Sequence, residues 1–332
     1  MHNPIAGTDI PGPDVRGLIR ETARAVDEQG ISGLTVPAKA VYHKLLQQGS
    51  RLRPAGQSIY DAEWDVLIVL DACRADLFRS VVAANPDRFD FIQRGQLTCR
   101  RSLESATRPW MRRTFGPDVD GVGETQYVVG NPWSAHELTA DWFAELTEVW
   151  ADSWDETHGT LLAADVTDAA LAASEDLAID SDERLLVHYM QPHCPFVEAT
   201  ALSTPKATDG FAAAAERDVW ERLQDGEFDS QDVWDGYRSN LLHALEEVDR
   251  LLSGIDAPNV VVTSDHGNAL GEYGLYGHPE SMPFDCLRTV PWLETTGEDT
   301  GEHDSDERSV QTTADQASAA TVESRLEALG YK

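Results

Sequence analysis

Two apolar runs that each end in an acidic side chain place the strongest limit on how this chain of 332 residues can fold. One is VVVTSDHG at 260–267, and the other is WDVLIVLDACRAD at 64–76. An uninterrupted β-branched or aliphatic run suits a strand that is buried on both faces of a parallel sheet. Ligand sites in such sheets lie just beyond the carboxyl ends of the strands. We therefore expect Asp71, Asp265 and His266 at that edge of a sheet.

Other segments alternate between strand and helix patterns. Residues 126–129 and 184–190 read as strands, and the second ends in QPHCPF, which contains His193. Helical spacing predicts helices over 14–48, 135–150, 165–177, 237–252 and 322–329. The acidic stretch 294–316 has few large apolar residues and predicts a solvated loop or disorder. This alternation predicts an α/β fold whose mostly parallel sheet is covered on both faces.

The charge balance excludes several classes of partner. The chain has 58 acidic against 26 basic residues, a formal net charge of −32, and only four of the basic residues are lysines. Such a surface repels nucleic acid phosphates and anionic membranes, so we expect no nucleic acid partner. We interpret the acidity as a halophilic adaptation to a high-salt cytoplasm, where the short Debye length screens self-repulsion. An ordinary acidic protein is the alternative.

The sequence also bears on location and redox chemistry. Residues 1–15 lack the basic start and apolar core of a signal peptide, and no stretch approaches the ~20 apolar residues of a transmembrane segment. The four cysteines form no C-x-x-C pair and no regular spacing, so they predict neither a zinc knuckle nor a disulfide framework. We expect a soluble, cytoplasmic protein whose oligomeric state the sequence leaves open.

The polar residues at the predicted strand ends suit a metal ion and a nucleophile. Carboxylate and imidazole donors together suit Zn or Mn, and oxygen donors alone suit Ca or Mg. We expect one divalent metal ion rather than two. The stretch SLESATRPW offers Ser102, Ser105 and Thr107 as hydroxyls near a helix start. A metal-activated hydroxyl can attack an ester phosphorus or sulfur, and the residues alone leave the choice among these three open.

Five segments, taken in order, carry a resemblance to a known family. LIVLDACRADLF, TRP, HYMQPHCPF, VVVTSDHGNALGEYGLYGH and LEALGY resemble the sulfatase-like branch of the alkaline phosphatase superfamily, in particular haloarchaeal-type hydrolases and transferases. The resemblance implies a three-layer α/β/α sandwich. It begins near Tyr60, so we expect an N-terminal helical extension at 1–58 and a catalytic domain at 59–332.

The resemblance implies a role for each matched position. The implied metal ligands are Asp71, Thr107, Asp265 and His266. Thr107 is implied as the nucleophile, and His193 as a residue that touches the substrate or protonates the leaving group. His278 is implied as a substrate contact or as a ligand of a second metal. Arg74, in the D-x-x-R-A-D pattern, completes the implied catalytic set.

Departures from the family pattern bear on the substrate. Thr107 stands where sulfatases have a residue that is converted to formylglycine, and Ala72 stands where many have a second aspartate. None of the four lysines lies within the matched motifs. We therefore predict a metal-dependent hydrolase or transferase of phosphate or sulfate esters, with a small-molecule or a glycan or glycolipid ester as substrate. The alternatives are a sulfatase that works without formylglycine and an inactive family member that serves as a glycan-binding or assembly subunit.

Overall fold

The structure is a computed structural model that describes residues 55–175, 183–202, 218–301 and 318–331, with four residues between 42 and 47. The chain divides into two compact units, Met1–Pro54 and Ala55–Lys332. The helices expected over 14–48 lie almost wholly outside the described residues, and so do residues 302–317. The second unit contains the sheet and all the matched motifs.

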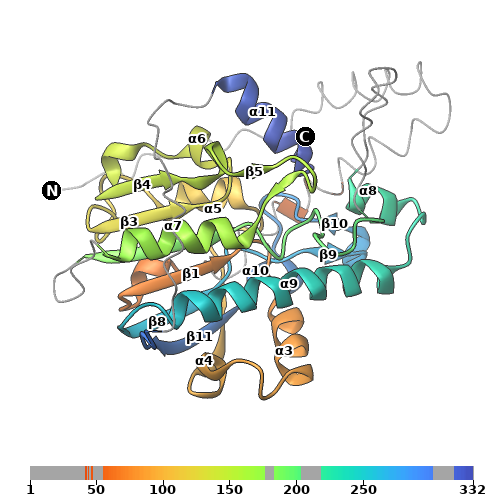
Figure 1. Cartoon of the computed structure of the whole chain (residues 1–332). Coiled ribbons are helices and arrows are strands. Elements are labelled where there is room, and N and C mark those ends of the chain that lie inside the picture. Colours follow the sequence, from red (N-terminus) through yellow and green to blue (C-terminus); the bar gives the residue numbers. More distant parts are fainter. Residues whose placement is uncertain are drawn as a thin grey trace, which may run out of the picture. The chain divides into compact units, whose positions relative to one another are not determined.

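A seven-stranded sheet forms the centre of this unit (Figure 1), in the order β2-β11-β8-β1-β7-β3-β4. Its strands are β1 (Val66–Leu70), β2 (Gln96–Arg101), β3 (Thr125–Val129), β4 (Glu145–Glu148), β7 (Arg184–Tyr189), β8 (Ala257–Thr263) and β11 (Thr289–Gly297). Strands β8, β1, β7, β3 and β4 pair in parallel, whereas β11 pairs antiparallel with both β8 and β2. Val69 of β1 pairs with His188 of β7 on one side and with Thr263 of β8 on the other. The carboxyl ends of β1, β7 and β8 therefore meet at one edge.

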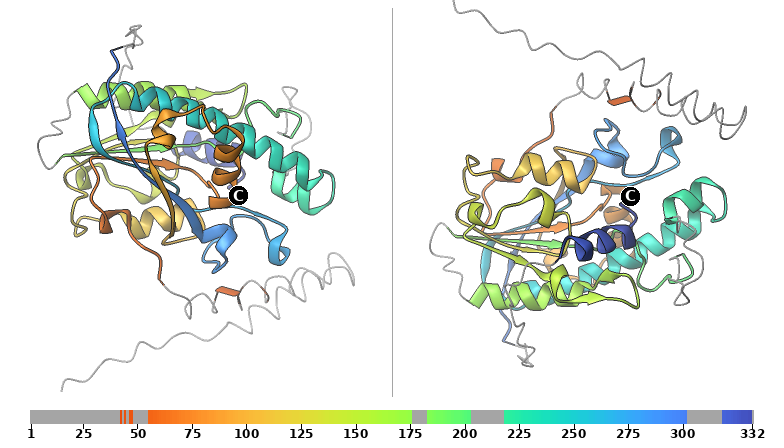
Figure 2. Two further views of the ribbon diagram at one scale, coloured as in Figure 1. Left: turned by 90° about the horizontal axis from the view of Figure 1, so that it is seen from below. Right: turned by 90° about the horizontal axis from the view of Figure 1, so that it is seen from above.

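Hydrophobic clusters cover both faces of the sheet. Alternate residues of β1 point to opposite faces, with Ile68 in one cluster and Leu67 in the other. The first cluster includes residues of α3 (Ala75–Ala84), α7 (Ala163–Glu175), α9 (Ser230–Leu252) and α11 (Ala319–Ala328), and the second includes residues of α5 (Thr107–Thr114). Figure 2 shows α7 and α9 on one side of the sheet and α5 on the other. This arrangement confirms the predicted three-layer α/β/α fold with a mostly parallel sheet.

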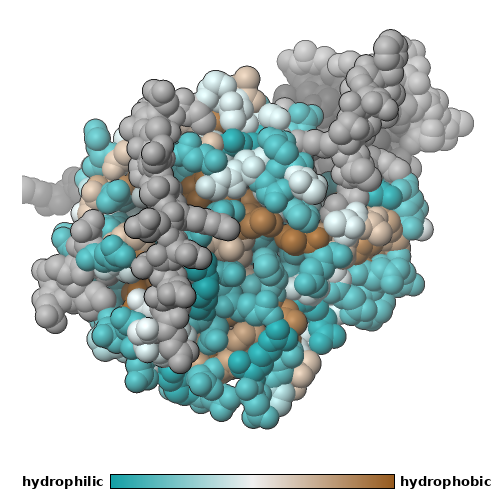
Figure 3. All heavy atoms as spheres, viewed as in Figure 1, coloured by the Kyte–Doolittle hydropathy of each residue, from teal (hydrophilic) through white to brown (hydrophobic). Residues whose placement is uncertain are grey.

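Shorter elements complete the described part of the unit. These are α4 (Asp90–Gln93), α6 (Ser134–Glu137), α8 (Val219–Gln224) and α10 (Asp285–Arg288), the strand pairs β5 (Trp154–Asp155) with β6 (Thr160–Leu161) and β9 (Ala269–Leu270) with β10 (Tyr276–Gly277), and the 3₁₀ turns η2 (Ile59–Asp61), η3 (Ala140–Trp142), η4 (Val149–Ala151) and η5 (Glu272–Gly274). Within the described ranges, no helix has both the length and the apolar character needed to span a bilayer. On the face in Figure 3, hydrophilic side chains cover most of the surface that is not grey.

Two predictions from the sequence are wrong. The helix expected over 135–150 is short, because α6 ends at Glu137 and residues 145–148 form β4. Pairing with the exposed edge of β3 supplies backbone hydrogen bonds there, and this outweighs the helical spacing. The loop expected from residue 294 begins later, because β11 continues to Gly297. Backbone pairing with β2 or β8 tolerates the polar side chains at 294–297.

Candidate active site

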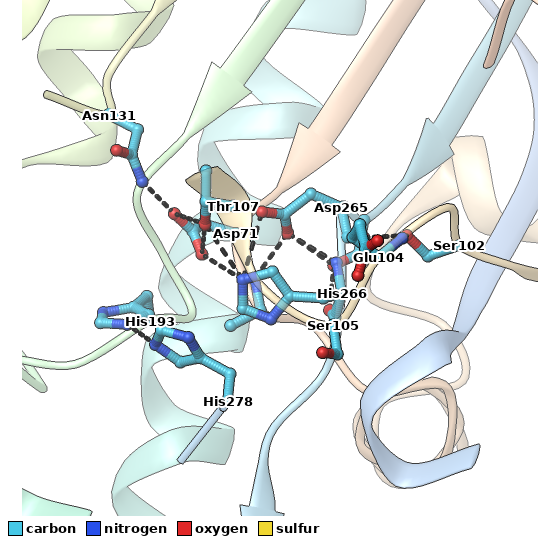
Figure 4. Close-up of polar contacts among 12 residues, drawn as sticks. Asp71, Ser102, Glu104, Ser105, Thr107, Asn131, His193, Asp265, His266 and His278 are labelled. Atoms are coloured by element: carbon cyan, nitrogen blue, oxygen red, sulfur yellow. Dashed lines mark hydrogen bonds and ion pairs between the residues drawn. The ribbon is translucent and has the colours of Figure 1, made fainter. Parts of the chain in front are cut away.

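Buried polar side chains from several elements converge at the carboxyl edge of the sheet (Figure 4). Asp71 directly follows β1, Asn131 lies two residues after β3, and Asp265 and His266 follow β8 closely. Thr107 is the first residue of α5. All five side chains are fully buried. Residues that lie up to 195 positions apart in sequence therefore form one cluster.

A strained turn joins the ends of β1 and β8. Ala72 has φ +60°, in the left-handed region that residues with a Cβ atom rarely adopt. In this conformation its N–H donates to Asp265 Oδ1 at 2.9 Å, and the N–H of Cys73 donates to Ser264 Oγ at 2.8 Å. These bonds turn the Asp265 carboxylate toward Asp71.

The loop after β8 depends on a glycine. A Cβ atom on Gly267 would lie 2.3 Å from the carbonyl oxygen of Cys286, so only glycine fits without movement. The N–H of Gly267 donates to the carbonyl of Leu287 at 2.9 Å. This close approach fixes the backbone on which Asp265 and His266 are carried.

The contacts of His266 determine where its lone pair points. Its Nδ1 lies 2.9 Å from the carbonyl oxygen of Gly267, which can only accept, so Nδ1 carries the proton. In the neutral ring, Nε2 then has no proton and carries a lone pair. Nε2 lies 3.0 Å from Thr107 Oγ1, 3.3 Å from Asp265 Oδ2 and 3.7 Å from Asp71 Oδ1. A nitrogen lone pair and two carboxylates repel one another unless a proton or a cation lies among them.

The donor set fits a divalent cation. Asp71, Asp265 and His266 each offer a ligand atom, and these atoms lie within 4.8 Å of one another. Asp265 Oδ2 is buried and has no hydrogen-bond partner among the described residues. Two carboxylates, an imidazole with its second nitrogen bonded to a carbonyl, and a hydroxyl are donors that suit Zn or Mn. The donor types, their spacing and the unpartnered oxygen of Asp265 are compatible with an added cation.

The two carboxylates differ in their tendency to ionise. Burial raises the pKa of Asp71 well above its usual range, and the charge of Asp265 raises it further. Burial also acts to raise the pKa of Asp265, but the imidazoles of His266 and His188 and the hydrogen bonds from the Ala72 N–H and the Thr107 hydroxyl together lower that pKa. In the metal-free protein, Asp265 is therefore ionised before Asp71. Binding of a divalent cation would favour the ionised form of both.

Thr107 is the hydroxyl that reaches the cluster. It follows the extended N-cap residue Ala106, and Pro109 fits in the same first turn because its missing N–H has no helical partner there. Thr107 Oγ1 lies 3.4 and 3.5 Å from the two carboxylate oxygens of Asp71. The rival hydroxyls are engaged elsewhere, because Ser105 donates to the carbonyl of Pro279 and Ser102 donates to the backbone carbonyl of Asp265.

His193 and His278 form a pair beside this cluster. His193 follows β7, His278 follows β10, and their Nε2 atoms lie 3.0 Å apart. The ring of His278 also lies 4.7 Å from that of His266, between ring centroids. Burial lowers the pKa of His193 to about 4 and the pKa of His278 well below its usual range. Both rings are therefore neutral at neutral pH.

The structure does not bring Arg74 into the cluster. Its guanidinium donates to Asp76 at 2.6 and 2.8 Å, to Glu272 at 2.6 Å and to the carbonyl of Asn268 at 2.9 Å. These are all the side-chain hydrogen bonds of Arg74 within the described ranges. Arg74 thus ties the turn after β1 to the loop after β8.

A cavity of about 300 Å³ opens over Thr107, His278 and Tyr331. Its other charged and aromatic lining residues are Arg108, Trp133, Asp218, Trp220, Glu221, Tyr276 and Glu280. Sequence reasoning missed Asn131 and Tyr331. Asn131 follows a predicted strand closely, which was a usable signal, whereas Tyr331 had none beyond its place in the closing LEALGY.

Comparison with known proteins yields structural neighbours only. No protein-family model and no curated protein matches the chain. The soluble domain of lipooligosaccharide phosphoethanolamine transferase A from Neisseria meningitidis is similar at 15% identity, with 75% of this chain and 81% of that chain covered and a TM-score of 0.47. The C-terminal periplasmic domain of phosphoethanolamine transferase EptC from Campylobacter jejuni is similar at 15% identity, with 69% and 77% covered and a TM-score of 0.44.

A 2-O GAG sulfatase is similar at 12% identity, with 70% of this chain and 63% of that chain covered and a TM-score of 0.44. These neighbours are two phosphoethanolamine transferase domains and a sulfatase. The fold of this chain is established by its own sheet and helices.

Proposed function

We propose that the protein is a metal-dependent hydrolase or transferase that acts on phosphate or sulfate esters, with Thr107 as its nucleophile. The observation that supports this proposal most directly is the position of Thr107. A buried hydroxyl at the start of a helix lies within 3.5 Å of an imidazole lone pair and a carboxylate, in a cluster that also contains an orphaned carboxylate oxygen. A purely structural threonine would not need these neighbours.

Asp71, Thr107, Asp265 and His266 would hold the cation. When bound, a divalent cation at such a cluster lowers the pKa of a hydroxyl and offsets the negative charge of an ester oxyanion. Asn131 keeps Asp71 oriented, because its Nδ2 donates to Asp71 Oδ2 at 2.6 Å. The proposal uses one cation, since the described residues form a single group of three or more acidic, histidine or cysteine ligands.

The chain's own groups supply the remaining chemistry. Thr107 Oγ1 forms a bond to phosphorus or sulfur, and its proton passes to the carboxylate of Asp71, 3.4 Å away. The bond from phosphorus or sulfur to the leaving oxygen breaks, and the His193–His278 pair delivers a proton to that oxygen. An anionic ester beside the pair raises the pKa of both imidazoles, which makes one of them a usable acid. Water or an acceptor alcohol then forms a bond to phosphorus or sulfur and gives its proton to the His193–His278 pair. The bond to Thr107 Oγ1 breaks, and Thr107 takes its proton back from Asp71.

The cavity beyond Thr107 favours particular esters. Among the described residues, the cavity is lined by three carboxylates, from Asp218, Glu221 and Glu280, and by one cation, Arg108. The guanidinium of Arg108 is itself paired with Glu137 at 2.7 Å and lies over the Trp133 ring at 4.7 Å. A second anionic group on the substrate would be repelled here. We therefore propose an ester whose leaving group is neutral or cationic.

Replacement of Thr107 tests the proposal. In protein loaded with Mn²⁺ in molar KCl, Thr107→Ala should lower turnover of p-nitrophenyl phosphate, bis(p-nitrophenyl) phosphate or p-nitrophenyl sulfate by at least about 10³-fold. Thr114→Ala removes the other buried threonine of α5 and should keep turnover near that of the wild type. Equal turnover of Thr107→Ala and wild type would exclude Thr107 as the nucleophile. Hydrolysis of the sulfate alone would favour a sulfatase without formylglycine.

A metal measurement separates the enzyme from the inactive alternative. Wild-type protein that binds neither Mn²⁺ nor Zn²⁺ and turns over none of these esters would favour a glycan-binding or assembly role. Near-stoichiometric metal with ester turnover would favour the enzyme. Metal with neither ester turnover nor orthovanadate binding would overturn the proposal.

A further inference from the structure

A phenol from the end of the described chain enters the candidate active site. The Tyr331 ring stacks on the ring of His193, with centroids 5.1 Å apart and planes at 27°. It also meets the rings of Trp133 at 5.7 Å and His278 at 5.4 Å. Its hydroxyl lies 3.1 Å from Asn131 Nδ2 and 3.4 Å from Asp71 Oδ2. None of the chemistry proposed above uses this residue.

The sequence LEALGY explains how the ring is delivered. Gly330 has φ +79°, and the N–H groups of Gly330 and Tyr331 donate to the carbonyls of Glu327 and Leu326, which is a Schellman motif. A Cβ atom on Gly330 would lie 2.9 Å from the Cβ atom of Asp218. The motif turns the chain sharply at the end of α11 and directs Tyr331 into the cavity.

Helix α11 is held firmly enough to position the phenol. Leu326 and Leu329 are each 2% exposed and belong to the main hydrophobic cluster. Arg325 donates to the carbonyls of Trp150 and Ala151, and its guanidinium lies over the Trp150 ring. The Tyr331 ring is held by α11 through the backbone and by His193 through stacking, so it loses little conformational entropy when a ligand binds.

The hydroxyl of Tyr331 has a proton to offer. Asn131 donates to the phenol oxygen, so the phenol hydrogen must find another acceptor. The hydroxyl oxygen of Thr107 is one partner in reach, and the other is Asp71 Oδ2 at 3.4 Å, which already accepts a shorter bond of 2.6 Å from Asn131. A phenol keeps its proton at neutral pH. The proton is therefore weakly engaged.

We propose that Tyr331 is a further catalytic residue, whose phenol donates a hydrogen bond to a non-bridging oxygen of the phosphoryl or sulfuryl group transferred to Thr107. The residues Thr107, His278 and Tyr331 line the same cavity, so an ester that reaches the nucleophile also meets the phenol. A donor aimed at developing negative charge stabilises the transition state more than the ground state. This inference rests on the ester chemistry proposed above.

Tyr331→Phe tests the inference, because it removes the hydroxyl and keeps the ring. In Mn²⁺-loaded full-length protein, kcat for bis(p-nitrophenyl) phosphate should fall about 10- to 100-fold with KM nearly unchanged. Orthovanadate affinity, measured by calorimetry, should fall about 10-fold, while metal content and Tm stay the same. Tyr273→Phe is the control, because Tyr273 is 60% exposed on η5 and is not among the residues that line the cavity.

Three outcomes would overturn the inference. Tyr331→Phe could match the wild type in both kcat and vanadate affinity, which would show that the hydroxyl contacts no reacting group. Tyr331→Ala could turn over faster than the wild type, which would show that the ring obstructs the site. Wild-type protein could load Mn²⁺ and yet neither turn over esters nor bind vanadate. This last result is distinguishable because it arises without any substitution, and it would overturn the proposed function as well.

Discussion

The Nε2 atoms of His193 and His278 lie 3.0 Å apart, a separation that requires one shared proton between them. His193 Nδ1 faces the carbonyl oxygen of Cys194 and must donate to it. Nε2 of a neutral His193 is therefore the acceptor, and Nε2 of His278 is the donor. The hydrogen bond therefore runs from His278 to His193, and both rings remain uncharged.

This pair predicts a pH dependence of stability. The pKa of His193 is lowered to about 4 in the folded state, from about 6.5 in the unfolded chain. Between pH 6.5 and 4, the histidine binds a proton in the unfolded chain but not in the folded protein. The free energy of unfolding therefore falls as the pH drops through this range, by about 1.4 kcal/mol per pH unit for each histidine of this kind. In urea melts at pH 7.5, 6 and 5, His193→Asn should show a smaller loss than the wild type. Identical slopes for His193→Asn and the wild type would contradict the prediction.

Asp265→Asn should separate stability from metal binding. In metal-free protein this change removes a buried charge beside Asp71 and keeps an oxygen for the N–H groups of Ala72 and His266, so we expect Tm to stay level or rise. Mn²⁺ at 100 times its Kd should stabilise the wild type by about 2.7 kcal/mol, or roughly 5 °C. The variant should show no such shift in calorimetric melts. Asp76→Asn, outside the cluster, should keep it, and an equal shift in Asp265→Asn would place the metal elsewhere.

Gly267→Ala should disrupt the loop after β8. The new Cβ atom would meet the Cys286 carbonyl at 2.3 Å, so the loop or α10 must move, at a cost of about 1–3 kcal/mol. Thermal melts should show a lower Tm together with weaker Mn²⁺ binding. At Gly123 the same substitution meets no atom within 4 Å and should change stability by less than about 0.5 kcal/mol. Similar Tm values for the two variants would show that the close approach carries no strain.

The formal charge of −32 predicts that salt stabilises the fold. The Debye length shortens from about 10 Å at 0.1 M to about 3 Å at 1 M, so self-repulsion among surface carboxylates weakens. We expect Tm to rise by several degrees between 0.1 and 2 M KCl, measured by circular dichroism. A Tm that is independent of KCl would argue against the halophilic interpretation.

The strands β1 and β8, which carry Asp71 and Asp265 at their ends, were predictable because their sequences fit only one kind of element. The runs at 66–70 and 260–263 are too apolar and β-branched for anything but a strand covered on both faces, and polar residues follow each directly. Strand β2 (Gln96–Arg101) escaped prediction because its residues are only partly buried and polar. Its strand conformation depends on pairing with β11, and the local sequence of β2 does not indicate this distant pairing.

The site was predictable in its residue types and less so in its contacts. Thr107 could not be separated from Ser105 by sequence, because the choice depends on where α5 begins and on which hydroxyl meets a backbone carbonyl. Arg74 resembled a catalytic residue by motif, and only the structure shows its guanidinium bonded to Asp76 and Glu272. Such choices are set by tertiary neighbours.

The order of strands in the sheet has a kinetic consequence. Asp71 meets Asp265 only after β1 has paired with β8, and it meets Asn131 only once β7 has joined β1 to β3, although these segments are far apart in sequence. Contacts of such high contact order form late, so a refolding chain has no assembled cluster until most of its sheet exists. A cation that binds this cluster would then leave the folding rate almost unchanged and would lower the unfolding rate.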